Sequence, residues 1–228
     1  AFAQIDANAP AKKDAVLVGH SMGGMIARLL VSDADVTQKT LSMMNNRQLN
    51  KFQHLPIISQ RLVIKDIPNF SRAIFLATPH RGTDYADRWF TKAARKVIRI
   101  PGAFISAISD SIQTQELDIK ELLQQINHGL IQNGPSDLSY QSKFIQLTKD
   151  INPRKGLAFH SIIGNITNSS NIDVITDDVV RYKSAHLEGA VSEKIIKGGH
   201  SIQETPAAIL ELRRILRLHL TQLGLHQP

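Results

Sequence analysis

A short glycine-rich run directly after an apolar segment constrains this chain more than any other feature. The run is GHSMGG, at residues 19–24, and the apolar segment 15–18 before it has the composition of a buried strand. Apolar residues at a helical spacing follow it up to residue 32. A serine on such a strand-to-helix turn has an exposed hydroxyl, and glycines two positions either side let neighbouring backbone approach. The pattern predicts Ser21 as a nucleophile, with Gly19 and Gly23 relieving crowding.

The same turn predicts a site that stabilises the negative charge formed during the reaction. The helix after Ser21 points the positive end of its dipole at the reaction centre. The backbone N–H of Met22 is then expected to be one donor to a developing oxyanion.

Composition sets the class of protein. The 228 residues, 42% of them hydrophobic, suffice for one sizeable core, and length alone suggests one or two domains. Absence of cysteine excludes disulfides, thiolate catalysis and cysteine-ligated metal. No apolar stretch approaches the roughly twenty residues that cross a bilayer. No signal sequence is recognisable at Ala1, and we expect a bacterial cell-envelope or secreted protein whose export signal would lie upstream of Ala1.

The net charge of +7 raises the question of nucleic acid or membrane as a partner. Basic residues are spread along the chain without a zinc-finger or RNA-binding signature, so we expect no nucleic-acid partner. Residues 88–99 combine a basic and an apolar face, which suits either contact with a membrane surface or, as we prefer, a solvated surface helix.

Four apolar runs organise the rest of the chain, and each leads into a loop rich in glycine, histidine or proline. They are residues 15–18, 73–77, 159–163 and 194–197. Continuous apolar runs favour a parallel sheet covered on both faces by helices, and the four loops would then converge at the carboxyl ends of the strands. Thr205 and Pro206 predict the start of a last helix, with Gly224 at its end. Its predicted buried stripe is Ala208, Ile209, Leu212, Ile215 and Leu216.

Residues 84–156 differ in character, with three helical stretches and a polar link, and predict a cap or lid over the site. The core domain would then comprise residues 1–83 and 157–228.

Serine needs a base, and the base needs an acid to orient it; on this class of fold they follow in the order serine, acid, histidine. His200, just past the fourth strand, is the expected base. His160 and His219 lie inside predicted elements and are expected to be structural. His80 would break the order, so we expect it to shape the site with its hydrogen bonds satisfied. Together with His20 and His186, it is expected to line the substrate pocket. The spacing leaves Asp177 and Asp178 as equal candidates for the acid, with Asp173 as a third.

Taken together, the motifs resemble a known family. The strings VLVGHSMGG, IFLATPHRGT, FHSIIGN, DDVVRYKSAHLEGA and GGHS followed by PAAILELRRILRLHL are similar to the bacterial lipase/esterase branch of the α/β-hydrolase superfamily, and to inositol-deacylase-like serine hydrolases. The resemblance implies Ser21 as nucleophile, Asp177 as acid and His200 as base. It favours Asp177 because the family usually has aspartate followed by glycine there, which aligns Asp178 with the glycine. Two residues depart from the family pattern, Asp178 in place of that glycine and Arg181 where proline is common, and they keep Asp178 as a competitor for the acid.

The resemblance also implies strands that this sequence lacks, because the superfamily places several strands and a second oxyanion donor before the serine turn. We therefore expect the C-terminal part of an α/β-hydrolase fold, with the missing N-terminal half as its partner. Residues 1–228 alone should be poorly soluble or weakly active, because the strand before Ser21 would have an unpaired edge.

The predicted function is cleavage of carboxylic esters, of lipids or other acyl esters, with no metal or organic cofactor required. The alternative is a non-catalytic relative that binds a lipid or a protein through the same pocket. Acyl length, head group and the choice among lipase, esterase, thioesterase and amidase are not determined by these residues.

Overall fold

A four-stranded parallel sheet forms the centre of the computed structural model, which describes residues 9–46, 49, 63–84 and 138–225. The strands lie in the order β1-β4-β5-β6, and each overlaps one of the four apolar runs. Their bounds are β1 Ala15–His20, β4 Phe70–Leu76, β5 Ala158–Asn165 and β6 Ser192–Lys197. The predicted α/β class with a mostly parallel sheet is confirmed.

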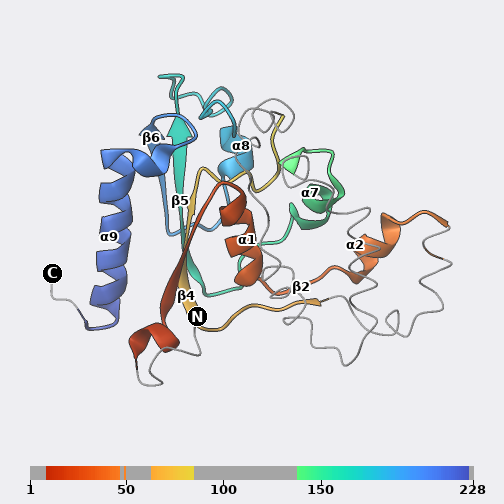
Figure 1. Cartoon of the computed structure of the whole chain (residues 1–228), viewed down its shortest axis with the longest axis horizontal. Coiled ribbons are helices and arrows are strands. Elements are labelled where there is room, and N and C mark those ends of the chain that lie inside the picture. The colour runs from red at the N-terminus through yellow and green to blue at the C-terminus, as the bar shows by residue number, and fades with distance from the viewer. Residues whose placement is uncertain (1–8, 47–48, 50–62, 85–137, 226–228) are drawn as a thin grey trace.

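Helices cover both faces of this sheet (Figure 1): α1, Met22–Leu30, lies on one face and α9, Pro206–Gln222, on the other. Alternate side chains of β4 pack against the helices on opposite faces of the sheet. Ala73 and Phe75 pack in a cluster with Ala27 of α1, whereas Ile74 and Leu76 pack in a cluster with residues of α9. Burial on both faces is why the two central strands, β4 and β5, contain apolar runs without polar alternation.

Helix α9 begins as its sequence predicts. The Thr205 side chain accepts a hydrogen bond from the Ala208 N–H at 3.3 Å, and Pro206 occupies the first turn. The prediction that Ile209 belongs to the buried stripe of this helix is wrong, because the residue is 52% exposed. The helix buries His219 instead, whose Nδ1 accepts from Arg72 Nε at 3.3 Å.

Short elements complete the described part of the chain. Strands β2, Ala34–Asp35, and β3, Val63–Ile64, form an antiparallel pair that the sequence did not predict, because two residues are too few to show a period. The remaining elements are η2 Pro10–Lys12, α2 Thr37–Ser42, α7 Lys143–Thr148, α8 Tyr182–Ala185 and η5 Ile202–Glu204.

Most of the predicted cap, including the basic segment 88–99, lies outside the described residues. The part that is described, residues 138–156, packs on the core. Leu138 and Ile145 are buried against Met25 of α1. This end of the predicted insertion therefore rests directly on the helix that follows Ser21.

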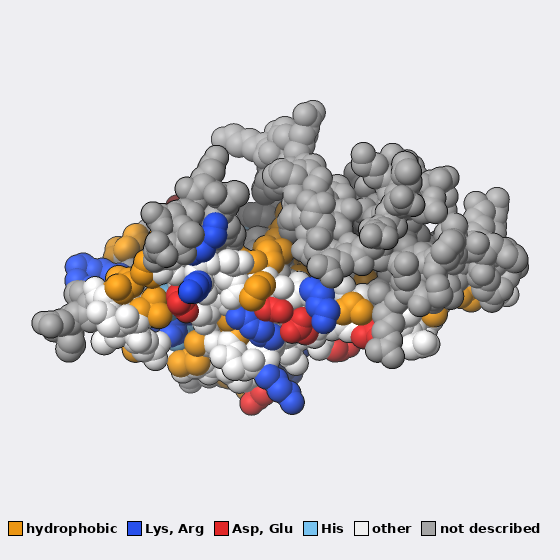
Figure 2. All heavy atoms as spheres, turned by 90° about the horizontal axis from the view of Figure 1, so that it is seen from below, with side chains coloured by type: hydrophobic (Ala, Val, Ile, Leu, Met, Phe, Trp, Pro, Cys, Tyr) orange, Lys and Arg blue, Asp and Glu red, His pale blue; other side chains and the backbone are white. Residues whose placement is uncertain are grey.

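Strand β1 pairs with β4 along one side, and within the described ranges no strand pairs with its other edge. Val18, in the middle of β1, is 45% exposed. On the face shown in Figure 2, basic and acidic side chains are interspersed with hydrophobic ones. Among the described helices, none is long and apolar enough to cross a membrane.

Candidate active site

Ser21 occupies a strained turn at the end of β1, where it serves as the N-cap of α1. Its φ of 53° and ψ of −127° lie in a region that residues other than glycine seldom adopt. The surrounding backbone holds it there: the Ser21 N–H donates to the Leu76 carbonyl at 2.9 Å, and the Ser21 carbonyl accepts from the Gly24 N–H at 2.9 Å. The turn thus fixes the direction of the serine side chain.

Of the two glycines predicted to relieve crowding around Ser21, one has that role. A Cβ on Gly19 would lie 2.6 Å from the Gly23 carbonyl oxygen, so this position must be glycine, as expected. A Cβ on Gly23 would meet nothing within 4 Å, and the prediction for this residue is wrong. The close approach is made by Gly24 instead, against the side chain of Thr78 in the loop after β4. The sequence signal for it was the second glycine of the GG pair.

Three side chains that the sequence places far apart meet at this turn. His200 Nε2 lies 2.7 Å from Ser21 Oγ, and His200 Nδ1 lies 2.9 Å from Asp177 Oδ2. Because a carboxylate only accepts hydrogen bonds, Nδ1 carries the proton and Nε2 is left to accept from the serine hydroxyl. His200 is 7% exposed and Asp177 1% exposed, so the row is shielded from water except at its serine end.

The turn around Asp177 separates it from its two competitors. Its second oxygen, Oδ1, accepts from the N–H groups of Val179 at 2.9 Å and Val180 at 2.6 Å. Asp178 is exposed, with a φ of 78° that suits the glycine usual in the family. Asp173 is on the surface and forms an ion pair with Lys183 at 2.9 Å. Of the three carboxylates, the structure brings Asp177 to His200.

Residues after β4 brace the acid turn, a role that sequence reasoning missed. The Thr83 hydroxyl donates to the Val179 carbonyl, and the Thr83 N–H donates to the Leu138 carbonyl at 2.8 Å. Arg81 donates to the carbonyl of Lys183 at 3.0 Å. The signal was present in the string TPHRGT, which follows a strand end as the other site loops do.

Two histidines predicted to line the substrate pocket have other environments. His20 Nε2 lies 2.8 Å from the carbonyl oxygen of His200, and burial lowers the pKa of His20 below its usual 6.5. His80 is completely buried, so it presents no surface to a substrate in this conformation. Its ring nitrogens also lack the expected partners among the described residues. Burial, followed by the charges of Arg28 and Arg81, holds the pKa of His80 well below 6.5.

His186, the third predicted pocket residue, lies just after α8, with about a third of its side chain exposed. Its Nδ1 is 2.7 Å from Glu193 Oε2, and its ring stacks on Tyr182 with the centroids 5.3 Å apart. The Tyr182 hydroxyl donates to Glu193 at 2.7 Å, and burial together with this carboxylate raises the pKa of Tyr182 to about 12. The ring of His186 is therefore held by a surface network.

Met22 is the first residue of α1, where backbone N–H groups have no partner within the helix. Its N–H follows Ser21 directly in the chain.

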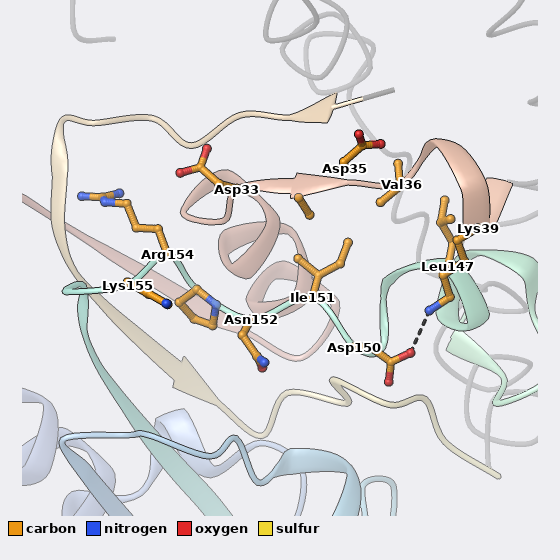
Figure 3. Close-up of a pocket in the computed structure, with 12 residues that line it drawn as sticks. Asp33, Asp35, Val36, Lys39, Leu147, Asp150, Ile151, Asn152, Arg154 and Lys155 are labelled. Atoms are coloured by element: carbon orange, nitrogen blue, oxygen red, sulfur yellow. Dashed lines mark hydrogen bonds and ion pairs between the residues drawn. The ribbon is translucent and has the colours of Figure 1, made fainter. Parts of the chain in front are cut away.

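No group of three or more metal-ligating side chains occurs in the part of the chain that the structure describes. A hollow of about 650 Å³ lies away from Ser21, between the segment that follows α1 and residues 147–155 (Figure 3). Charged residues of both signs line it, with Lys39 and Asp150 paired at 2.8 Å. None of Ser21, Asp177 and His200 contributes to its lining.

Similarity to solved structures is distant. The Bacillus licheniformis lipase BlEst2 in its mature form is 16% identical with a TM-score of 0.40, and the alignment covers 88% of this chain and 65% of the lipase. The propeptide form is 18% identical at the same TM-score, with 88% and 36% covered. The Vlm2 thioesterase domain is 15% identical with a TM-score of 0.29, and 90% of this chain and 65% of that domain are covered. The chain thus spans less than two thirds of each, and scores this low carry no argument about function.

No curated protein matches the sequence significantly. A family model does match its first part, residues 2–45, which contain β1, the serine turn and α1. The model is that of the PGAP1-like alpha/beta domain, an α/β-hydrolase family. Over residues 2–45, this match confirms the resemblance to the α/β-hydrolase superfamily that the motifs predict.

Proposed function

We propose that this protein is a serine hydrolase that cleaves carboxylic esters through an acyl-enzyme. The observation that carries the proposal is the hydrogen-bonded row from Ser21 Oγ through His200 to Asp177, with distances of 2.7 and 2.9 Å. A serine hydroxyl is a weak nucleophile until a neighbouring base removes its proton, and the base works only in the correct tautomer. The row supplies both conditions.

In the proposed first step, Ser21 Oγ attacks the ester carbonyl while His200 Nε2 takes the hydroxyl proton. Asp177 stabilises the imidazolium that forms and holds its Nδ1–H in direction. The carbonyl oxygen becomes an oxyanion, which accepts from the Met22 N–H at the positive end of α1. His200 then returns the proton to the leaving alcohol, and the acyl group remains on Ser21.

Deacylation repeats the sequence with water as the nucleophile. His200 Nε2 takes a proton from water, the hydroxide attacks the acyl carbonyl, and Ser21 recovers its proton as the acid is released. Each step uses the same side chains and leaves them unchanged.

We further propose lipid or other acyl esters as the substrate class. The motifs that resemble lipases support this choice, together with the match of residues 2–45 to an α/β-hydrolase family. The preferred head group and acyl length would be determined by residues other than Ser21, His200 and Asp177.

Covalent labelling tests the proposal directly. A fluorophosphonate probe should label the full-length protein on Ser21, and Ser21→Ala should abolish both labelling and hydrolysis of a p-nitrophenyl ester. Labelling that persists in Ser21→Ala would refute the mechanism. Stoichiometric binding of a lipid without ester turnover would instead support a non-catalytic binding module.

A further inference from the structure

His20 makes a contact that the mechanism above does not use. It is the last residue of β1, next to Ser21, and its Nε2 lies 2.8 Å from the main-chain oxygen of His200. The two imidazole rings also touch, with their centroids 5.1 Å apart and their planes inclined by 46°. Two consecutive residues at the end of β1 therefore contact His200: Ser21 contacts its ring, and His20 contacts its backbone.

The chemistry of this contact fixes the state of His20. A carbonyl oxygen only accepts, so His20 Nε2 must carry a proton and donate it. Burial lowers the pKa of His20, which keeps its ring neutral near pH 7. Neutrality matters because a second cation beside His200 would oppose the imidazolium that forms during catalysis.

The segment that carries His200 has little side-chain support on its N-terminal side, where Gly198 and Gly199 precede it. Gly198 donates from its N–H to the Asn165 carbonyl at 3.1 Å. On the other side, Ile202 is fully buried and anchors the chain. Between these two anchors, the hydrogen bond from His20 restrains the backbone of the base itself.

We propose that His20 is a positioning residue for the base, which it holds against Ser21 by donating a hydrogen bond to the His200 carbonyl. This inference rests on the proposed function and replaces the expectation that His20 contacts substrate.

The contact gains importance after the first chemical step. Once Ser21 Oγ carries the acyl group, its hydroxyl proton is gone and it no longer donates to His200. Asp177 still holds the ring and His20 still holds the backbone of His200, which keeps the imidazole where it must activate water. Loss of the His20 donor should therefore slow turnover, while substrate binding is little changed.

Two substitutions at position 20 separate the donor from the bulk of the side chain. His20→Gln keeps an amide N–H at the same number of bonds from Cβ as Nε2, whereas His20→Leu keeps comparable volume without a donor. Val18→Thr, two residues earlier and half exposed, controls for disturbance of β1. The readouts are kcat and KM for a p-nitrophenyl ester on the full-length protein, with the melting temperature measured alongside.

We expect His20→Leu to lower kcat about 10- to 100-fold with KM within about twofold of the parent. His20→Gln should keep kcat within about threefold of the parent, and Val18→Thr should match it. Equal loss in both His20 variants, or a change confined to KM, would overturn the positioning role. Unchanged kcat in His20→Leu would do the same while Ser21→Ala still abolished labelling, so failure here is distinct from failure of the hydrolase proposal.

Discussion

Gly24 packs against Thr78 so closely that a Cβ atom at residue 24 would overlap the threonine hydroxyl oxygen and lie 2.7 Å from its methyl carbon. This contact joins the first turn of α1 to the loop after β4. It sets the distance between the helix that follows the nucleophile and the loop that braces the acid turn. The second glycine after Met22 is therefore a packing requirement of the site.

Gly24→Ala should destabilise the protein by about 1–3 kcal/mol, because the added methyl group has no room and must displace α1 or the Thr78 loop. Gly23→Ala is the matched control. Its Cβ meets nothing within 4 Å, and alanine favours a helix, so stability should stay level or rise by up to about 1 kcal/mol. Urea unfolding of both variants measures the difference, and equal stabilities would contradict the packing argument.

Asp177→Asn should lower kcat by roughly 10³- to 10⁴-fold, because an amide cannot fix the His200 tautomer that accepts from serine. The adjacent carboxylate provides the control, since Asp178 points to solvent. Asp178→Asn should hydrolyse a p-nitrophenyl ester within about twofold of the parent rate. A large loss in Asp178→Asn with little in Asp177→Asn would reverse the assignment of the acid.

Asp178→Gly should raise stability by about 0.5–1 kcal/mol. The φ of 78° at this position strains an L side chain, and glycine adopts it without that strain. Thermal unfolding should show a higher midpoint with kcat unchanged. A lower midpoint would mean that the aspartate side chain contributes more to the turn than its exposed position indicates.

Acidification should weaken the fold through a buried network on the α9 side of the sheet. His160 is completely buried and accepts a hydrogen bond from the Arg72 guanidinium, and its Nδ1–H donates to Ser192 at 2.7 Å. Burial, followed by the charge of Arg72 and then of Arg214, lowers the pKa of His160 to about 4. Glu211, paired with Arg214 at 2.6 Å, opposes this shift only in part.

Because the folded-state pKa of His160 lies below its unfolded value of about 6.5, the unfolded chain binds the proton first. The stability contribution is complete above pH 6.5 and is lost as the pH falls toward 4, at up to about 1.4 kcal/mol per pH unit. His160→Gln should be less stable at pH 7.5 but lose less stability between pH 6.5 and pH 4.5. Parallel pH profiles of unfolding free energy in the two proteins would contradict this assignment.

The parallel sheet was predictable chiefly because its central strands, β4 and β5, are buried on both faces, which leaves continuous apolar runs in the sequence. The meeting of Ser21 and His200 was predictable for a related reason, since both follow strand ends that share one edge of the sheet. The last helix was signalled by its cap, Thr205 and Pro206. Its rotation was not: Ile209 is exposed, whereas His219 is buried and accepts a hydrogen bond from Arg72.

Features that depend on backbone angles or on packing between distant segments could not be predicted from the sequence. Spacing could not separate Asp177 from Asp178, because the left-handed φ of Asp178 decides which carboxylate faces inward. The role of Gly24 depends on Thr78, 54 positions away, and that of His20 on the main chain of His200. The cap over residues 84–156 stays a prediction over most of its length.

Thr83 connects two segments that are distant in the sequence, the turn that carries Asp177 and the segment that begins at Leu138. Its hydroxyl donates to the Val179 carbonyl in the acid turn, and its N–H donates to the Leu138 carbonyl within the predicted cap. Exchanging the segment between them for one from another hydrolase would therefore alter more than substrate choice. A graft that kept Thr83 and the backbone at Leu138 would leave Asp177 in place. A graft that replaced either residue would lower turnover, and this loss could be mistaken for a change in substrate specificity.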